Sequence, residues 1–183
     1  MLDPVDAVLL LVHTNGDRID GRTVIQKLVY FTQLLVPLSR KFHFVPHFYG
    51  PYSSELAALL DSLVGLRFLR AEVTRTPRHR DMYSYRLTED GLAVTSRLQD
   101  SGDAKKVLSV IEKCRSLTAL NPDVLSYAAK ANHILSQRRR AYTDAQVVAE
   151  GKKFGWHMTP DQVKRGVDVL LDLGLAKRKK AAN

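Results

Sequence analysis

Apolar residues recur at helical spacing in the first 65 residues and predict three helices there. The first is expected to begin after Asp3, with Pro4 at its first position, and to end at the Asn15-Gly16 pair. The second is expected to begin from a cap at Asp20 and to bury a stripe made of Val24, Ile25, Leu28, Phe31 and Leu35. The third is expected to begin after Ser53 and to bury a stripe made of Leu56, Leu59, Leu60 and Leu63, with Gly65 at its end.

The pattern then changes to the alternation that is typical of half-buried β-strands. Residues 69–74 and 83–87 alternate apolar and polar side chains, which predicts a β-hairpin. Residues 76–81 connect the two strands. Because Pro77 has no N–H to donate to a strand ladder, we expect this connection to be an exposed turn. Thr88 is expected to cap the helix that follows.

The second half of the chain has a helical pattern throughout. After the break at residues 101–103, four helices are expected, and Asn121 followed by Pro122 is typical of a helix start. Thr143 with Gln146 and Thr159 with Gln162 have the spacing of capping boxes. By contrast, residues 42–49 are rich in aromatic and β-branched side chains but contain a proline, so they form at most an edge strand or an extended connection.

The order helix, helix, helix, hairpin, helix predicts a winged helix-turn-helix domain in residues 1–100. The fold class expected is therefore mainly α with a small β hairpin, the winged-helix half packed with a helical domain in residues 104–183. That second domain is either a plain helical bundle or a degenerate second helix-turn-helix, and it ends in a basic tail.

Two short motifs resemble those of a known family. Residues 26–31 (QKLVYF), followed by residues 48–53 (FYGPYS) and Leu56, are similar to the pattern of the uncharacterised YwgA-like proteins. More distantly they resemble the Panacea domain of antitoxin and protease-adaptor proteins. The resemblance covers residues 5–95. It implies a winged helix, and it implies regulation or protein interaction in prokaryotic cells, without catalytic residues.

Composition narrows the classes of function. The chain has one cysteine, Cys114, so neither an internal disulfide nor a cysteine-rich zinc site is expected. The apolar run at residues 7–12 is far shorter than the ~20 residues that span a bilayer, and no basic segment precedes it. We therefore expect a cytoplasmic protein that does not bind membranes. The net charge of +9 favours polyanionic partners, nucleic acid first and an acidic protein second.

The sequence contains no recognisable set of catalytic residues, so we expect no enzyme activity, no cofactor and no metal. Neither GxxxxGK[ST] nor GxGxxG occurs, which argues against nucleotide hydrolysis. His43 and His47 are four residues apart, but in an extended segment where this spacing does not bring them together. Cys114 lies between two basic residues, which allows either a reactive thiol or a small buried side chain.

Arginine is concentrated in and around the predicted hairpin. Because arginine forks match phosphate oxygens, this element is the candidate nucleic-acid contact. The candidate binding residues, which include two basic residues of the second helix, are Arg22, Lys27, Arg70, Arg75, Arg78, His79 and Arg80. The third helix weakens a DNA hypothesis, because neither Arg nor Lys occurs from Ser53 to Val64.

Two functions follow from these patterns. The first is a winged-helix regulator that binds double-stranded DNA mainly through backbone phosphates, as a homodimer. The alternative is a protein-interaction module of antitoxin or adaptor type, in which the same surface holds an acidic protein.

Overall fold

The computed structural model describes residues 1–75, 81–137 and 141–177. These residues form eight α-helices and one three-stranded antiparallel sheet, so the prediction of a mainly helical chain with a small hairpin is confirmed. They divide into two compact units, an N-terminal unit of residues 1–44 with 53–112 and a C-terminal unit of residues 45–52 with 113–183. The boundary lies inside helix α5 (Gly102–Thr118), rather than at the expected break at residues 101–103, because α5 continues through it.

Helix α1 (Pro4–Thr14) is the buried centre of the N-terminal unit. Residues 7–12 are all buried, because α1 contacts helix α2 (Arg22–Leu35), helix α4 (Glu89–Leu98) and the sheet. The carboxylate of Asp3 caps the helix by accepting a hydrogen bond from the backbone N–H of Val5 at 2.8 Å. At the other end, Gly16 has a left-handed φ of +80°. The predicted start and end of this helix are confirmed.

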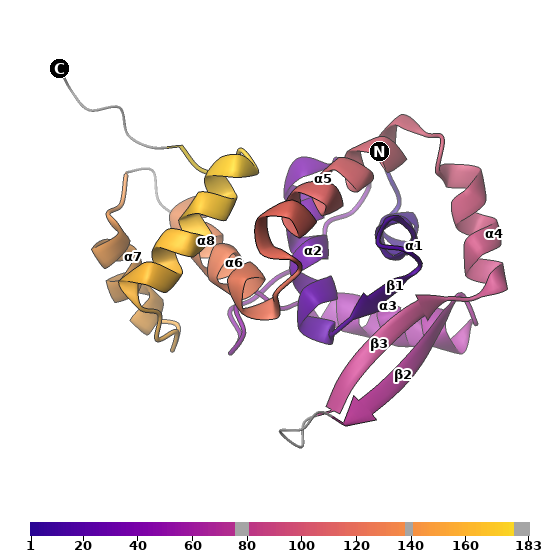
Figure 1. The fold of residues 1–183 in the computed structure, drawn as a ribbon, viewed down its shortest axis with the longest axis horizontal. Coiled ribbons are helices and arrows are strands. Elements are labelled where there is room, and N and C mark those ends of the chain that lie inside the picture. The colour runs from indigo at the N-terminus through magenta and orange to yellow at the C-terminus, as the bar shows by residue number, and fades with distance from the viewer. Residues whose placement is uncertain (76–80, 138–140, 178–183) are drawn as a thin grey trace. The chain divides into compact units, whose positions relative to one another are not determined.

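The sheet has the order β1-β3-β2, and all its pairs are antiparallel. Its strands are β1 (Arg18–Asp20), β2 (Leu69–Arg75) and β3 (Asp81–Leu87). The predicted hairpin is confirmed, and Figure 1 shows it extending beyond α3 and α4. Strand β1 was not predicted, because three residues are too few to show an alternating pattern. Asp20 therefore belongs to a strand, and Gly21 takes the cap position of α2 that was expected for Asp20.

Helix α3 (Ser54–Gly65) begins as predicted, since the hydroxyl of Ser53 accepts a hydrogen bond from the backbone N–H of Leu56. Its end differs from the prediction. Gly65 is still helical, and the left-handed residue that ends the turn is Arg67, with φ +63°. This conformation is held by a hydrogen bond from the N–H of Phe68 to the carbonyl of Leu63 at 2.9 Å.

Two buried glutamines of α2 hold the chain that connects α2 to α3. The amide of Gln26 donates to the carbonyl of Ser53 and accepts from its N–H, both at 2.9 Å. Seven residues further along the helix, Gln33 makes the same pair of bonds to the backbone of Phe42, at 3.3 and 3.0 Å. A spacing of seven places both amides on one side of α2. The helix thus fixes the residues on either side of segment 45–52.

We expect Gln26→Ala to lower the free energy of unfolding by about 2 kcal/mol, because it leaves a buried N–H and a buried carbonyl without partners. Urea unfolding monitored by circular dichroism measures this change. The control is Gln99→Ala, since Gln99 is exposed and we expect a change of less than about 0.5 kcal/mol. Equal effects of the two substitutions would contradict the role of Gln26.

The C-terminal unit is built from segment 45–52, the end of α5 and three further helices. These are α6 (Pro122–Ser136), α7 (Asp144–Lys152) and α8 (Pro160–Asp172). Both predicted capping boxes are present, Thr143 with Gln146 and Thr159 with Gln162. Helices α6 and α8 cross closely at Gly166. No helix in the described part of the chain is long and apolar enough to span a membrane.

Candidate nucleic-acid interface

Three arginines form a row across the exposed face of the sheet. The register places Arg18 of β1 opposite Arg86 of β3, and Arg86 opposite Arg70 of β2. Residues directly opposite each other in antiparallel strands point to the same face, so the three side chains stand side by side. Arg70 and Arg86 are exposed, and Arg18 is partly exposed. We call Arg18, Arg86 and Arg70 the arginine row.

The next positions on the same face are polar or acidic. Asp20, Ser84 and Glu72 are cross-strand partners in the same order as the arginines. Arg18 donates from Nε to Asp20 at 2.7 Å and from Nη2 to Ser84 at 3.2 Å, which fixes its orientation. The pKa of Asp20 is lowered, chiefly by its hydrogen bond from Ser84. The hydrogen bond and charge of Arg18 and the charge of Arg86 lower it further, whereas burial raises it. The Asp20 carboxylate therefore stabilises the fold at pH values above its unfolded pKa of about 3.9. This stabilisation is lost as the pH falls through the lower pKa that Asp20 has in the folded protein.

An open groove adjoins the arginine row at the start of β2. It has a volume of about 800 Å³ and lies where α3, the sheet and the start of α4 meet. Its lining includes Arg67, Arg70 and Arg86 together with Glu89 and Asp90 of α4. The groove therefore has a basic group of residues and an acidic one, and its basic side continues the arginine row.

The structure corrects the expected role of Lys27, and it shows that Arg22, whose side chain is 40% exposed, makes contacts within the fold. Lys27 is buried, with 2% of its surface exposed, so it cannot reach a DNA phosphate and does not belong to the interface. Arg22 is bound within the fold: it donates to the hydroxyl of Tyr85 at 2.8 Å and to Asp61 at 3.0 Å. Its guanidinium also lies 4.2 Å from the centre of the Tyr83 ring. These contacts leave the arginine row as the basic group of the sheet's exposed face.

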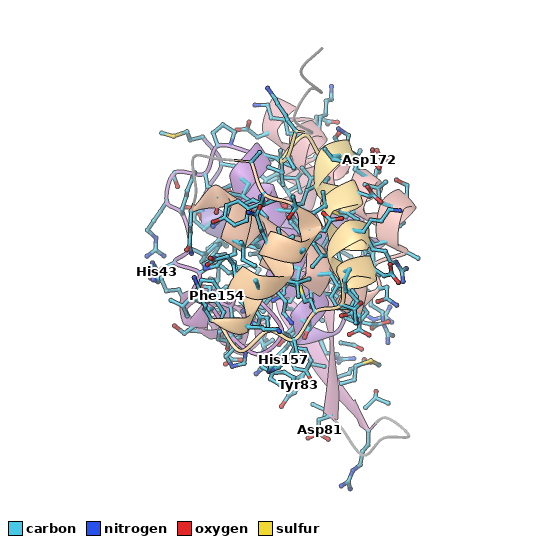
Figure 2. The ribbon with its side chains drawn as sticks, turned by 90° about the vertical axis from the view of Figure 1, so that its left-hand side faces the viewer. His43, Asp81, Tyr83, Phe154, His157 and Asp172 are labelled. Carbon is cyan, nitrogen blue, oxygen red and sulfur yellow. The ribbon has the colours of Figure 1, made fainter. Side chains whose placement is uncertain are left out.

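Of the hairpin residues predicted to bind nucleic acid beyond Arg70, the structure describes Arg75. Arg75 is exposed and lies opposite Asp81, on the face away from the arginine row. Figure 2 shows Asp81 toward the far end of the hairpin and Tyr83 nearer its base. The other three candidates, Arg78, His79 and Arg80, lie outside the described residues.

The candidate binding residues predicted from sequence omit two members of the row, Arg18 and Arg86, although Arg86 belongs to the arginine-rich hairpin. Arg86 alternates with Tyr85 and Leu87, so the strand pattern alone places it on the polar face. Arg18 gave no such signal, because its strand is three residues long and its partner is 68 positions away. Only strand pairing could bring these two arginines together.

Cys114 is fully buried, and burial raises its pKa to about 12. The buried alternative of the sequence analysis therefore holds. We expect the native thiol to react with a thiol reagent at pH 8 at least about a thousandfold more slowly than in the unfolded chain, because reaction needs an exposed thiolate. Absorbance during labelling in buffer and in guanidinium measures both rates. Rapid labelling of the native protein would contradict this assignment.

Two further features are candidate sites: the single tryptophan, Trp156, and the side chains that could bind a metal ion. Trp156 is buried and donates from Nε1 to the carbonyl of His47 at 2.7 Å, and its ring lies edge-on to His133 and tilted against Phe154. It is therefore packed within the C-terminal unit. The described residues contain no group of three or more histidine, cysteine, aspartate or glutamate side chains that could hold a metal ion.

Two aromatic residues of segment 45–52, Phe48 and Tyr49, lie at the surface. Phe48 is 71% exposed, and it lies edge-on to the ring of Tyr49 at the turn of this segment. Backbone hydrogen bonds between Val45 and Tyr52, both 2.9 Å, close the turn and hold the two rings outward. The segment therefore presents an apolar surface to solvent.

The fold and the site define a mainly helical protein with a small antiparallel sheet that carries arginines on its exposed face. Among known proteins, the chain is similar to the uncharacterised protein YwgA of Bacillus subtilis (strain 168), with 39% identity over 88 residues. The matched region is 48% of this chain and 51% of YwgA, so the chain spans about half the length of that relative. No family model matches the chain. The resemblance to YwgA-like proteins is thus supported over about half of the chain.

Proposed function

We propose that the protein binds duplex DNA through its backbone phosphates, with the exposed face of the sheet as the contact surface. The observation that carries this proposal is the arginine row. Neighbouring strands lie ~4.8 Å apart, so three side chains on adjacent strands extend over about 10 Å. A duplex carries one negative charge per ~1.7 Å of its axis. The row can therefore meet more than one phosphate, and each guanidinium can donate two hydrogen bonds to it.

The order of elements supports a winged-helix domain as the scaffold. Helix α1, strand β1, helices α2 and α3, and the hairpin β2–β3 follow the order of that fold. The connection from α2 to α3 is residues 36–53, however, whereas a helix-turn-helix has a turn of ~3–4 residues. Helix α3 also exposes Glu55 and Asp61, which phosphates would repel. Binding through the sheet, without base recognition by α3, agrees with both features.

The test replaces Arg18, Arg70 and Arg86 together by Gln. We expect weaker binding to duplex DNA by a similar factor for all sequences, because phosphate contacts carry no direct sequence information. If all three contact phosphates, the slope of log affinity against log salt should flatten by up to about 2.7. Fluorescence anisotropy with two unrelated labelled duplexes, titrated at several salt concentrations, measures both quantities.

The matched control replaces Arg40, Arg97 and Lys105 by Gln. These residues are exposed and lie outside the sheet, and their replacement removes the same net charge. We expect the control to change the slope much less than the sheet variant does. Equal slopes for the two variants would mean that only the net charge of the protein matters, which contradicts a specific role of the arginine row. Absence of duplex binding by the parent protein at low salt would refute the proposal.

The second candidate is a protein-interaction module, and the exposed ring of Phe48 favours it. Carboxylates bind arginine forks as phosphates do, so the arginine row also suits an acidic protein. An exposed apolar surface is a common feature of protein interfaces. A photo-crosslinking residue at position 48 is expected to trap one discrete partner in cells, and the same residue at Arg97 is not. Identical products from both positions would remove this candidate.

A further inference from the structure

We propose that two copies of the protein pair through the outer edges of their β2 strands, in one register that the sequence of the strand selects. Strand β2 is at the edge of the sheet, paired with β3 on one side. Seven consecutive residue pairs join it to β3 from Leu69 with Leu87 to Arg75 with Asp81. The described strand contains no proline and no bulge, which are two features that prevent edges from pairing.

Backbone hydrogen bonds at β1 show which residues of β2 direct their polar groups outward. The N–H of Gly21 donates to Tyr83, and the N–H of Leu87 donates to Asp17, so these two β3 residues point toward β1. Backbone groups alternate in direction along a strand, so Ser84 and Arg86 point toward β2. The backbone N–H and carbonyl groups of their partners, Glu72 and Arg70, therefore bond to β3. By the same alternation, the residues Leu69, Ala71, Val73 and Arg75 direct their N–H and carbonyl groups to the outer edge.

The side chains of β2 are complementary to a second, antiparallel copy of the same strand. A two-fold axis through Ala71 places Arg70 opposite the partner's Glu72, and Leu69 opposite the partner's Val73. Both Arg70–Glu72 pairs then lie on the face of the arginine row. The opposite face brings together Leu69, Ala71 and Val73, and covers the side chain of Val73, which is 56% exposed.

Other symmetric registers lack this match. Facing residues must share a face of the joined sheet, so the axis passes through a residue of β2. An axis at Arg70 or at Glu72 brings like charges directly opposite each other, which is unfavourable. An axis at Val73 places Glu72 opposite the partner's Thr74, without an ion pair. An open groove of about 800 Å³ adjoins this part of β2 and is lined by Leu69, Arg70 and Ala71.

The pairing has a consequence for the surface of the sheet. A two-fold axis perpendicular to the sheet keeps the same face of both copies on one side. The two arginine rows therefore lie on one continuous six-stranded surface, in which Arg70 of each copy is paired with Glu72 of the other copy and Arg18 and Arg86 lie further from the two-fold axis. This dimer does not depend on the proposed DNA binding, and it is measured on the protein alone.

The experiment is sedimentation velocity of the full chain over a range of concentrations, without nucleic acid. We expect a concentration-dependent dimer. Arg70→Glu and Glu72→Arg should each weaken dimerisation by about tenfold, because each turns two attractive cross-strand pairs into repulsive ones. The double variant, R70E with E72R, restores opposite charges and should dimerise about as well as the parent. This restoration is not expected if the two charges only protect a solvent-exposed edge.

A third variant tests the backbone pairing. The N–H of Ala71 points away from β3, so Ala71→Pro removes an outward donor without breaking the bonds between β2 and β3. We expect an unchanged thermal midpoint and no dimer. A parent protein that stays monomeric up to about 1 mM, a dimer insensitive to the single substitutions, or failure of the double variant to restore it would each overturn the proposal.

Discussion

Gly166→Ala is expected to destabilise the protein by about 3 kcal/mol, the upper end of the range for overpacked sites. Helix α8 passes so close to α6 at this point that the position has no space for a methyl group. A Cβ on Gly166 would lie 2.7 Å from the carbonyl carbon of Tyr127 and 2.8 Å from the backbone nitrogen of Ala128. These are main-chain atoms, so no side chain can move aside, and the two helices would have to separate.

The measurement is chemical unfolding of the variant beside Gly65→Ala. Gly65 is also helical, but a Cβ there has no atom within 4 Å. We expect this control to stabilise the protein by about 0.5–1 kcal/mol, because alanine loses less conformational entropy in a helix than glycine does. Opposite signs for the two substitutions would confirm the crossing at Gly166. A neutral or stabilising Gly166→Ala would mean that α6 and α8 pack differently.

Gly91→Ala is expected to have an effect of similar size, in the N-terminal unit. A Cβ on Gly91 would lie 2.2 Å from the carbonyl oxygen of Phe68 and 2.9 Å from a methyl group of Leu87. That carbonyl also accepts hydrogen bonds from Thr88, the residue that caps α4. The first turn of α4 would have to move away from the sheet, so we expect a loss of about 3 kcal/mol.

The clash at Gly91 also changes the site, since Leu87, Glu89 and Asp90 line the groove beside the arginine row. We therefore expect weaker duplex binding, in addition to a lower thermal midpoint. The control is Gly102→Ala, at the start of α5, where a Cβ has nothing within 4 Å. A stable Gly91→Ala variant with parental binding would show that the start of α4 neither contacts the sheet closely nor shapes the groove.

Much of the local structure could be predicted because its causes lie within a few residues. The caps at Asp3, Ser53 and Thr88 each use a side-chain oxygen that reaches an N–H two or three positions further on. Both capping boxes depend on the same short distances. The strands β2 and β3 could be predicted because apolar residues alternate with polar ones at residues 69–73 and 83–87, and because the sequence between them contains proline.

Predictions failed where the decisive partner is far away in the chain. Asp20 has the composition of a helix cap, but pairing with β3 draws it into a strand, and Gly21 takes its place. Lys27 was assigned to a surface because lysines are seldom buried, whereas packing of α2 encloses it. In the same helix, the amides of Gln26 and Gln33 gave no signal, because their partners are backbone groups that lie 27 and 9 residues further along the chain.

The sequence by itself therefore determined the helices, most of their starts, the hairpin and the positive charge, since each follows from propensity, periodicity or composition. Only the tertiary structure decided which charges act together. Arg18, Arg86 and Arg70 form one row because strand register sets three distant residues on the same face. Lys27 is removed from the surface by burial, and Arg22 lies on α2, where it contacts Tyr85 and Asp61. Register and burial depend on the whole chain, and local patterns do not contain them.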